Sequence, residues 1–398
     1  MKIVSVVGAR PNFMKIAPFI KAIEKYNIHH SGNGKIEHIL VHTGQHYDVR
    51  MSQQFFEDLN IPEADVNLEV GSGTHAEQVG QTMIQFEKVL KKERPDWVVV
   101  VGDVNATLAC SVTAKKEWIR CCHIEAGLRS GDLNMPEEIN RLVTDRLSDL
   151  LLTPDWLSNQ NLIREGVPES KIMMVGNIMI DTLEANRTKA LKLDIAEIIS
   201  NNMHSEASFT YRDPALFTEK GIATITLHRP SNVDFEHVLA PLTHFLADEV
   251  CSRMPLLWPI HPRAEKNLKL FGLWEKVLQV PNLYLLRPLG YHEMLRLNMA
   301  SRIMLTDSGG LQEECTVLGT PCLTLRWNTE RPVTLRDHGG ASVLVGNNID
   351  RIRNEFYNTL ENKREPYRPE LWDGQTAERC VEAIVSFKNP DGSKEHDF

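Results

Sequence analysis

Three acidic residues in the N-terminal half occupy positions suited to proton transfer. Asp103 ends the apolar segment DWVVVVGD, Glu125 ends CCHIEAG, and Glu137 follows Pro136, a residue type favoured at the first position of a helix. Parallel strands bring their carboxyl ends to one edge of a sheet, where α/β proteins gather functional groups. Acids that meet at such an edge raise one another's pKa, which suits general acid and base catalysis.

These acids also have simpler interpretations. Glu137 could serve only as a first-turn acid that stabilises the helix dipole and pairs with Arg141, four residues later. Glu138 fits the role of the plain first-turn acid better. A metal site at the segment GDVN is a further alternative, but neither a histidine-rich spacing nor a calcium loop accompanies it. We therefore expect acid/base chemistry rather than a metal.

A glycine turn near the N-terminus predicts an anion site. The first predicted strand runs into Gly8-Ala9-Arg10-Pro11, and the helix that follows carries Lys15. Backbone N–H groups at a positive helix end, with two cations nearby, suit a diphosphate. Neither GxGxxG nor a triphosphatase phosphate loop occurs here, which removes the usual NAD and ATP interpretations. The simpler alternative is that both cations only solvate the helix start.

The segment TDSGGLQEE predicts a second anion site, of the nucleotide-diphosphate kind. A strand leads into Ser308-Gly309-Gly310, and the helix that follows carries Glu313 and Glu314. Glycines let a phosphate approach the backbone N–H groups, and a glutamate about one helical turn later can accept two ribose hydroxyl bonds. The alternative is an ordinary strand–helix turn with capping acids.

Two histidines and a late arginine could join this site. His228 and His261 each end a predicted strand and are followed closely by an arginine. An imidazole at a strand's carboxyl end can serve a phosphate or a proton, although it is as often structural. Glu330 and Arg331 follow a further apolar strand, so they could also line the site.

The arrangement of elements predicts two doubly wound, Rossmann-like α/β domains facing a central cleft, because short β-branched segments alternate with longer amphipathic ones. The predicted domains are residues 1–176 and 177–375, with a helix at 376–387 that could pack back on the first. The polar stretch 200–220 has the composition of a linker. The predicted strands are 2–8, 37–44, 96–103, 121–127, 150–154, 221–230, 255–263, 283–288, 302–310 and 320–327. The predicted N-terminal helices are 13–26, 76–93, 105–118 and 136–151.

Composition excludes several function classes. The 398 residues are 42% apolar and 24% charged, as is ordinary for a globular protein. The formal charge of −9 argues against nucleic-acid and anionic-membrane partners. No apolar run approaches the roughly 20 residues that span a bilayer, and the first apolar stretch is too short for a secretory signal. Seven cysteines without CxxC spacing predict buried thiols and a cytoplasmic protein.

The chain resembles the non-hydrolysing UDP-N-acetylglucosamine 2-epimerase family over nearly its whole length. The segments that carry the resemblance are GARPNFMK, VGD, HIEAGLRSGDLNMPEEINR, TLHRP, PIHPR, TDSGGLQEE and TERP. Segments of this length, order and spacing are far more specific than any single one. The resemblance implies the two-domain fold of GT-B glycosyltransferases, with UDP held mainly by the second domain, and a homodimer.

The family's reaction gives the acids a purpose. Its members eliminate UDP in the anti sense, form a 2-acetamidoglucal, and add UDP back after C2 is reprotonated on the other face. The resemblance implies that Asp103, Glu125 and Glu137 are catalytic and that His228 lies near the departing diphosphate. It implies no metal and no cofactor. The residues matched to UDP or to the charges around it are Arg10, Lys15, Arg141, Ser308, Gly309, Gly310 and Glu314; His261 and Arg331 are our further candidates.

The chain departs from the family pattern at two places. Many bacterial members carry QHxxM as part of an allosteric substrate site, whereas here Gln45-His46 is followed by Met51, two positions later. The segment between Arg129 and Pro136 is also short, which bears on the sugar pocket.

Other functions share part of this pattern. A related group, the 2-epimerases of UDP-2,3-diacetamido-glucuronic acid, shares HTGQH, GLRS and MPEEINR, so its substrate ranks second. A UDP-sugar glycosyltransferase would explain the second half equally well, but it needs one base at the acceptor rather than several acids. A sugar-nucleotide sensor without catalysis is the third class.

Overall fold

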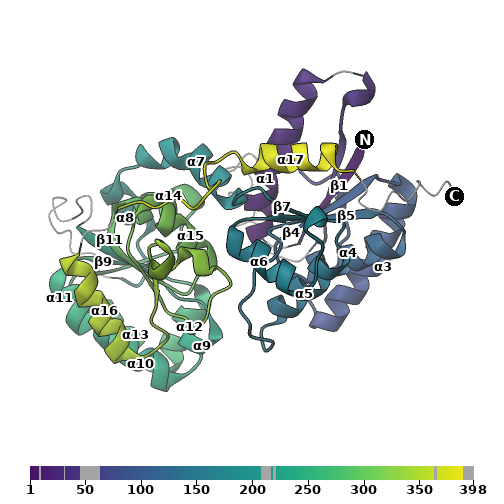
Figure 1. Cartoon of the computed structure of the whole chain (residues 1–398). Helices are drawn as coiled ribbons and strands as arrows, with labels where there is room; N and C mark the ends of the chain where they lie inside the picture. The colour runs from purple at the N-terminus through teal and green to yellow at the C-terminus, as the bar shows by residue number, and fades with distance from the viewer. Residues whose placement is uncertain are drawn as a thin grey trace. The chain divides into compact units, whose positions relative to one another are not determined.

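The protein forms two compact units, each built on a parallel sheet (Figure 1). The structure is a computed structural model that describes residues 1–8, 10–30, 32–44, 63–207, 217, 221–362 and 365–388, without the side chains of Arg10, Pro11 and Asn33. The N-terminal unit comprises Met1–Thr182 and Pro369–Phe398, and the C-terminal unit comprises Leu183–Arg368. The chain therefore crosses between them twice.

The N-terminal unit contains a seven-stranded sheet in the order β3-β2-β1-β4-β5-β6-β7. Its strands are β1 (Lys2–Val7), β2 (Glu37–His42), β3 (Val66–Asn67), β4 (Trp97–Val101), β5 (Arg120–Ile124), β6 (Leu150–Thr153) and β7 (Ile172–Met174). Its helices are α1 (Arg10–His29), η1 (Gly32–Gly34), α3 (His75–Glu93), α4 (Asn105–Lys116), α5 (Pro136–Leu147), α6 (Trp156–Arg164), η2 (Glu169–Lys171) and α17 (Thr376–Ser386). Helix α7 (Ile178–Leu191) begins in this unit and ends in the other.

The C-terminal unit contains a six-stranded sheet in the order β10-β9-β8-β11-β12-β13. Its strands are β8 (Ile222–Thr226), β9 (Leu256–Pro259), β10 (Leu283–Leu286), β11 (Ser301–Thr306), β12 (Cys322–Thr324) and β13 (Ser342–Leu344). Its helices are α8 (Ile195–Asn202), α9 (Pro230–Val233), α10 (Glu236–Phe245), η4 (Leu246–Val250), α11 (Cys251–Arg253), α12 (Pro262–Leu270), α13 (Trp274–Gln279), α14 (Tyr291–Ala300), α15 (Gly309–Leu318), η5 (Pro332–Thr334), η6 (Arg336–His338) and α16 (Ile349–Glu361).

Both sheets are doubly wound, which confirms the predicted fold class. In each sheet the strand order reverses once, at β1/β4 in the first and at β8/β11 in the second. A reversal of this kind opens a crevice at the carboxyl ends of the two strands, because their following helices leave to opposite faces. Each unit thus has one position favoured for ligand binding.

Apolar strands and amphipathic helices explain the two cores. In the N-terminal unit, Val98 and Val100 of β4 belong to one cluster with Phe86 and Leu90 of α3. In the C-terminal unit Trp258 of β9 and Phe356 of α16 belong to one large cluster. Each fully buried side chain of this size contributes about 1.5–3 kcal/mol to folding. The strands consist of continuous apolar residues because both faces of each sheet are buried.

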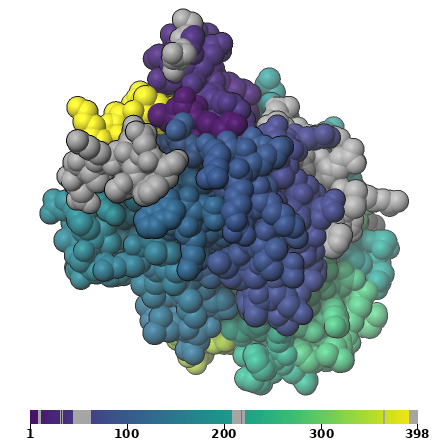
Figure 2. Space-filling view, turned by 90° about the vertical axis from the view of Figure 1, so that its right-hand side faces the viewer, coloured from purple at the N-terminus to yellow at the C-terminus, as the bar shows by residue number. Residues whose placement is uncertain are grey.

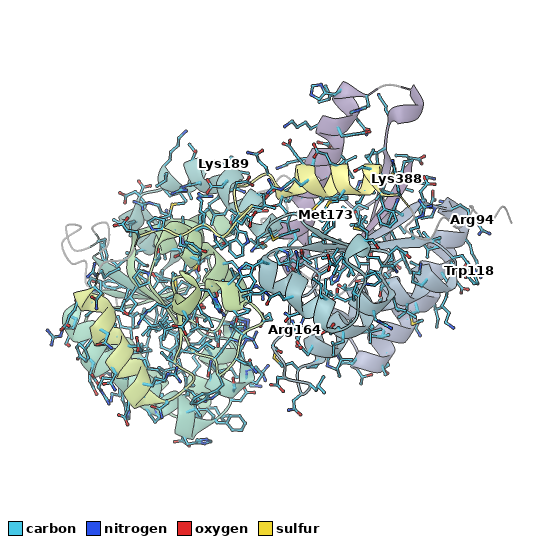
Figure 3. All side chains as sticks on the ribbon, in the orientation of Figure 1. Arg94, Trp118, Arg164, Met173, Lys189 and Lys388 are labelled. Carbon is cyan, nitrogen blue, oxygen red and sulfur yellow. The ribbon has the colours of Figure 1, made fainter. Side chains whose placement is uncertain are left out.

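The C-terminal ends of α3 and α4 lead into β4 and β5 at the edge of the first sheet that is opposite the predicted acids. Helix α3 begins at a capping box, in which Thr74 accepts from the Glu77 N–H group, and is followed by Arg94 at a φ of 45°. After α4 the chain turns at Trp118, with a φ of 60° and a side chain that is 93% exposed. Arg94 and Trp118 project outward from this unit (Figure 3) and precede the amino ends of β4 and β5.

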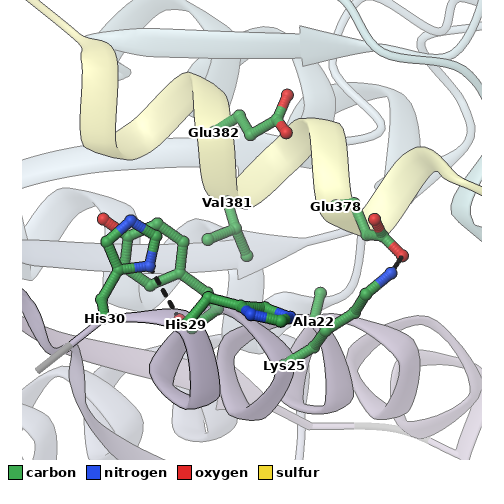
Figure 4. Close-up of a pocket in the computed structure, with 8 residues that line it drawn as sticks. Ala22, Lys25, His29, His30, Glu378, Val381 and Glu382 are labelled. Atoms are coloured by element: carbon green, nitrogen blue, oxygen red, sulfur yellow. Dashed lines mark hydrogen bonds and ion pairs between the residues drawn. The ribbon is translucent and has the colours of Figure 1, made fainter.

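The C-terminal helix α17 packs against α1 within the N-terminal unit. The two helices lie side by side in both views, yellow beside purple (Figure 1 and Figure 2). Asp181 accepts hydrogen bonds from the N–H groups of Thr376 and Ala377, at 3.1 and 2.7 Å, and burial raises its pKa to about 6. Lys25 pairs with Glu378 at 2.6 Å at the rim of a small pocket between the helices (Figure 4).

Some predicted elements were wrong. The helix predicted at 136–151 ends at Leu147, and Leu150 and Leu151 belong to β6, because a fully buried strand and an apolar helix face have similar local composition. The short strands β3, β7 and β13 were not predicted. The described part of the predicted linker, residues 200–207 and 217, is not a boundary between the two units. It lies within the C-terminal unit, where the preceding helix α8 buries Ile198 and Ile199. Residues 208–216 and 218–220 lie outside the described residues.

All seven cysteines are buried free thiols, as predicted. Among the described helices, none combines the length and the apolar character needed to cross a membrane.

Candidate active site

Two of the predicted acids lie at the carboxyl ends of neighbouring strands. β4 and β5 pair in parallel with Val101 opposite Ile124, so Asp103 and Glu125 both follow at the same edge of the sheet. β4 also flanks the point where the strand order reverses. The position follows from the strand–turn–helix pattern in the sequence, and it is the position where α/β proteins bind ligands.

Glu125 forms a buried ion pair with Lys15 of α1. Their side chains are only 2% and 8% exposed, so removal of either partner would leave an unpaired buried charge at a cost of about 3–5 kcal/mol. Gly102 makes room for the pair, because a Cβ atom there would lie 3.1 Å from Lys15 Nζ and 3.4 Å from Glu125 Oε2. The predicted cation and acid are thus brought together.

The backbone at Glu125 is held in an unusual conformation. Its φ is 72°, in the left-handed region that non-glycine residues rarely adopt. The N–H groups of Glu125 and Ala126 both donate to the Leu152 carbonyl, each at 3.1 Å. Strain of this kind costs about 1–3 kcal/mol and persists where surrounding contacts enforce it, often at functional sites.

Asp103 is paired with Arg141 of α5 at 2.5 Å, and its side chain remains 25% exposed. Arg141 also contacts Glu138, which is 2% exposed and accepts the Ser130 N–H group at 3.0 Å. Burial favours a higher pKa for Glu138, but the Ser130 N–H group and Arg141 lower it overall. The prediction that Glu138 is a plain first-turn acid was therefore wrong: it is the buried partner of the arginine that holds Asp103.

Glu137 lies exposed in the first turn of α5. Within the described part of the chain its carboxylate has no ion pair, and Arg141 instead pairs with Glu138 and Asp103. The simpler interpretation, a Glu137–Arg141 pair, is thus wrong. Pro136 begins the helix, as predicted.

Parts of the predicted site lie outside the described residues. Arg10 begins α1, but its side chain is not described. Gln45, His46 and Met51 lie in the segment 45–62, which is not described either.

A pocket of about 550 Å³ adjoins the Asp103 turn. Its walls include Leu108 of α4, Ile139 and Asn140 of α5, and Asn134 before that helix. Asn140 Nδ2 donates to the Asp103 carbonyl at 2.9 Å, so the pocket wall and the acid's turn are directly linked. The pocket offers apolar surface with a few amide groups, a lining suited to an uncharged polar ligand group.

Sequence reasoning missed a second buried pair behind the acids. His123 Nδ1 lies 2.6 Å from Asp145 Oδ1, and His123 Nε2 lies 2.8 Å from the Gly102 carbonyl. Asp145 Oδ2 accepts the Gly127 N–H group at 3.0 Å and Arg129 at 2.7 Å. Burial favours a raised pKa for Asp145, but His123 and Arg129 lower it overall. A polar residue inside the apolar run CCHIEAG was the available signal for this pair.

In the C-terminal unit, Asp307 organises the carboxyl ends of β8 and β11. It is fully buried and accepts the N–H groups of His228 and Arg229, at 3.0 and 2.9 Å, as well as Asn232 Nδ2 at 3.1 Å. Burial raises its pKa, yet His228 and the backbone N–H groups lower it overall. Asp307 lies near the end of a predicted strand, as Asp103 and Glu125 do. The predicted anion site, however, comprised the neighbouring Ser308-Gly309-Gly310 and did not include Asp307.

The two predicted histidines lie together. His228 Nδ1 is 2.6 Å from Asp307 Oδ1, and its ring centroid is 5.9 Å from that of His261. His261 Nδ1 accepts the Arg263 N–H group at 3.2 Å, so Nε2 carries the ring hydrogen, for which the described residues provide no acceptor. Desolvation and the charge of His228 lower the pKa of His261. His228 is 43% exposed, so this pair offers donors to a ligand.

The predicted glycine turn leads into helix α15 without a side-chain cap. Ser308 makes no capping hydrogen bond, and the first turn contains no acidic residue. The first N–H groups of the helix are therefore available to an anion. A Cβ atom at Gly309 would lie 2.8 Å from Arg331 Nη1 and 2.9 Å from Glu330 Oε1, so Arg331 borders this turn.

Arg331 and Glu314 lie in buried surroundings. Arg331 Nε is 2.7 Å from Glu313, and Arg331 also contacts Glu330, which Arg326 contacts at 2.6 Å. Glu314 is 4% exposed and receives Asn298 Nδ2 at 3.5 Å. Burial raises the pKa of Glu314 to about 7, with partial compensation by the Tyr291 hydroxyl and Asn298. The structure therefore groups Ser308, Gly309, Gly310 and Arg331 at one turn, and it buries Glu314 in the helix behind them.

Comparison with known proteins connects both sites to one family. A family model described as UDP-N-acetylglucosamine 2-epimerase matches residues 29–385. A Methanocaldococcus jannaschii protein named UDP-N-acetylglucosamine 2-epimerase is 40% identical over 387 residues, covering 97% of this chain and 99% of its own length. A Pseudomonas aeruginosa protein named UDP-2,3-diacetamido-2,3-dideoxy-D-glucuronate 2-epimerase is 36% identical, covering 97% and 99%.

A solved structure agrees with these sequence relatives. The crystal structure of M. jannaschii UDP-GlcNAc 2-epimerase in complex with UDP-GlcNAc and UDP matches with a TM-score of 0.82 and 39% identity, covering 97% of this chain and 99% of that one. The family resemblance carried by the sequence motifs is thereby confirmed. This chain belongs to the UDP-N-acetylglucosamine 2-epimerase family.

Proposed function

We propose that this protein is an isomerase that interconverts UDP-N-acetylglucosamine and UDP-N-acetylmannosamine. The observation that carries the proposal is the pair of carboxylates, Asp103 and Glu125, at adjacent strand ends, each in contact with a buried cation. The full-length likeness to the M. jannaschii epimerase supports the choice of substrate.

The proposed epimerisation needs more than one acidic residue. A base removes the weakly acidic C2 proton while the C1–O bond to UDP breaks, and C1 and C2 become doubly bonded in a 2-acetamidoglucal. Return of a proton to the opposite face of C2, with re-addition of UDP at C1, gives the epimer. One carboxylate cannot reach both faces of the ring, so at least two positioned groups are needed. We assign these roles to Asp103, Glu125 and Glu137 as a set. The overall reaction is redox-neutral.

The C-terminal unit supplies the groups for the departing diphosphate. Negative charge develops on the β-phosphate as the C1–O bond breaks, and preorganised donors stabilise such charge best. The uncapped turn at Ser308–Gly310, Arg331 and the His228–His261 pair are the donors we assign to it. In the N-terminal unit, Lys15 and Arg141 hold Glu125 and Asp103 in place by ion pairs.

Solvent exchange tests the proposal directly. In deuterated water without any acceptor, the protein is expected to place deuterium at C2 of UDP-N-acetylglucosamine and to form UDP-N-acetylmannosamine, both followed by NMR. A glycosyltransferase needs an acceptor and leaves C2 unlabelled, and a hydrolysing epimerase leaves free UDP at completion. Tight binding with no exchange would identify a sensor and contradict the proposal.

A second substrate is supported by one specific observation. The P. aeruginosa 2-epimerase of a diacetamido-glucuronate is 36% identical over nearly the full length. The same exchange assay on UDP-2,3-diacetamido-glucuronic acid, with product stereochemistry, separates the two substrates. A higher kcat/KM for the diacetamido sugar would assign that substrate instead, with the chemistry unchanged.

A further inference from the structure

The carboxylate of Asp145 on α5 connects the two turns that carry the strand-end acids. Its Oδ1 atom reaches the first turn through His123, which contacts the carbonyl of Gly102, the residue before Asp103. Its Oδ2 atom accepts the Gly127 N–H group in the second turn, two residues after Glu125. Both residues of the pair are buried, with His123 at 0% and Asp145 at 2% exposure. Burial this deep directs the polar contacts of both residues to the turns rather than to solvent.

Both nitrogen atoms of the His123 ring face acceptor atoms in this geometry. One nitrogen faces a carboxylate and the other a carbonyl oxygen, and each of these groups only accepts. The Asp145 carboxylate has no proton to offer, because Gly127 N–H and Arg129 donate to its second oxygen and its pKa is lowered. Arg129 is held in turn by Glu165, at 2.7 Å. The Asp145 carboxylate is thus surrounded by His123, the Gly127 N–H group and Arg129.

The second turn needs such a fixed point. Glu125 has a φ of 72° and Gly127 a φ of 82°, and a Cβ atom at Gly127 would lie 2.5 Å from the Ser158 carbonyl oxygen. A strained turn pressed against α6 relaxes unless surrounding contacts hold it. The Asp145–Gly127 hydrogen bond is one such contact, and it leaves the Glu125 carboxylate directed at Lys15.

We infer that Asp145, acting through His123 and Gly127, is a positioning residue that keeps the Asp103 and Glu125 turns in one mutual arrangement. α5 also carries Glu137 and Arg141. A single helix therefore carries the acid Glu137, pairs with Asp103 through Arg141, and supports the turns of Asp103 and Glu125 through Asp145. The inference rests on the proposed function for its catalytic consequence. Its structural part stands on the contacts alone.

The variant Asp145→Asn tests the inference, with Asp149→Asn as its matched control. Asp149 also binds β5, accepting the Cys121 N–H group at 2.8 Å and Lys115 at 2.7 Å, but at the amino end of that strand. An asparagine at 145 has one acceptor oxygen for three donors, so the turns lose part of their support. We expect kcat for C2 exchange to fall about 10- to 100-fold, as a displacement near 1 Å does, while UDP affinity is retained. Asp149→Asn is expected to keep its exchange rate.

Amide hydrogen exchange, read by mass spectrometry, gives a readout independent of activity. Asp145→Asn should speed exchange in peptides covering 102–103 and 127–129, and Asp149→Asn should speed it near 121. In the wild-type protein, NMR of the 15N-labelled ring should show two N–H hydrogens on His123, assigned by their loss in His123→Gln; this measurement holds even if Asp145→Asn does not fold.

The outcomes separate the inference from the proposed function. An unchanged C2 exchange rate in Asp145→Asn, an equal loss in Asp149→Asn, or a single ring N–H on His123 would overturn the inference. Absence of C2 exchange in the wild-type protein would instead contradict the proposed function, and the amide exchange and ring signals would still decide whether Asp145 holds the turns.

Discussion

The two strand-order reversals carry opposite kinds of chemistry. At β1/β4 and the neighbouring β5, carboxylates are already paired with buried cations, as in Glu125 with Lys15 and Asp103 with Arg141. At β8/β11 the buried carboxylate, Asp307, holds the scaffold, and the groups left for a ligand are N–H donors and half-exposed imidazole. Proton transfer needs acids held in a fixed geometry, whereas anion binding needs N–H donors that can reach the anion. The proposed function therefore assigns proton transfer to the first edge, the catalytic edge, and anion binding to the second, the binding edge.

The largest expected effect comes from Glu137→Gln at the catalytic edge. This change removes a carboxylate but no described ion pair, so the fold should persist, whereas loss of a general acid or base costs about 10²- to 10⁴-fold in rate. We expect C2 deuterium exchange to fall within that range while UDP affinity, measured by calorimetry, is unchanged.

Glu378→Gln is the matched control for this change. Glu378 is also an exposed first-turn acid, on α17, and its loss should affect only the helix dipole and the Lys25 pair. Full exchange activity in Glu137→Gln would remove Glu137 from the catalytic set.

An intermediate effect is expected from Gly309→Ala at the binding edge. The new methyl group would lie 2.8 Å from Arg331 Nη1, so the turn or the arginine must move away from the anion position. Loss of one charge-assisted hydrogen bond, at about 1.5–3 kcal/mol, weakens UDP binding by roughly 10- to 100-fold. Calorimetry with UDP measures this change directly.

Gly34→Ala in the short helix η1 controls for the Gly309 substitution. A Cβ atom at Gly34 would lie 3.7 Å from His30 Cβ, an ordinary van der Waals contact, so UDP affinity should stay at the wild-type value. Unchanged UDP affinity in Gly309→Ala would argue that the anion binds elsewhere.

The smallest effect concerns Asp307 and pH. Its pKa is lowered in the folded protein, so its contribution to stability is present above the unfolded value near 3.9 and is lost as pH falls through the lower folded value. Asp307→Asn should therefore reduce the free energy of unfolding by about 1–3 kcal/mol at pH 7. Urea unfolding should show that difference shrinking only below about pH 4. A difference that grew on acidification would contradict this assignment.

Much of the fold could be predicted because it depends on local pattern. Alternation of β-branched runs with amphipathic segments located β1, β4, β8 and β11, and the turn residues after them located Asp103, Glu125 and the Ser308–Gly310 turn. Motif spacing then indicated the family. Short strands such as β7 and β13 escaped because three residues carry too little periodicity to distinguish them from loops.

The pairing of charges could not be predicted in the same way. Lys15 and Glu125 are 110 residues apart, and the choice of Glu138 over Glu137 as the partner of Arg141 follows from which face of α5 is buried. The same holds for the His123–Asp145 pair and for the crossing of the chain inside α7. Residue types and spacing specify which groups end each strand, because that is a property of neighbours in the chain. Packing specifies which of those groups meet and which stay exposed, because burial and ion pairing depend on residues distant in the sequence.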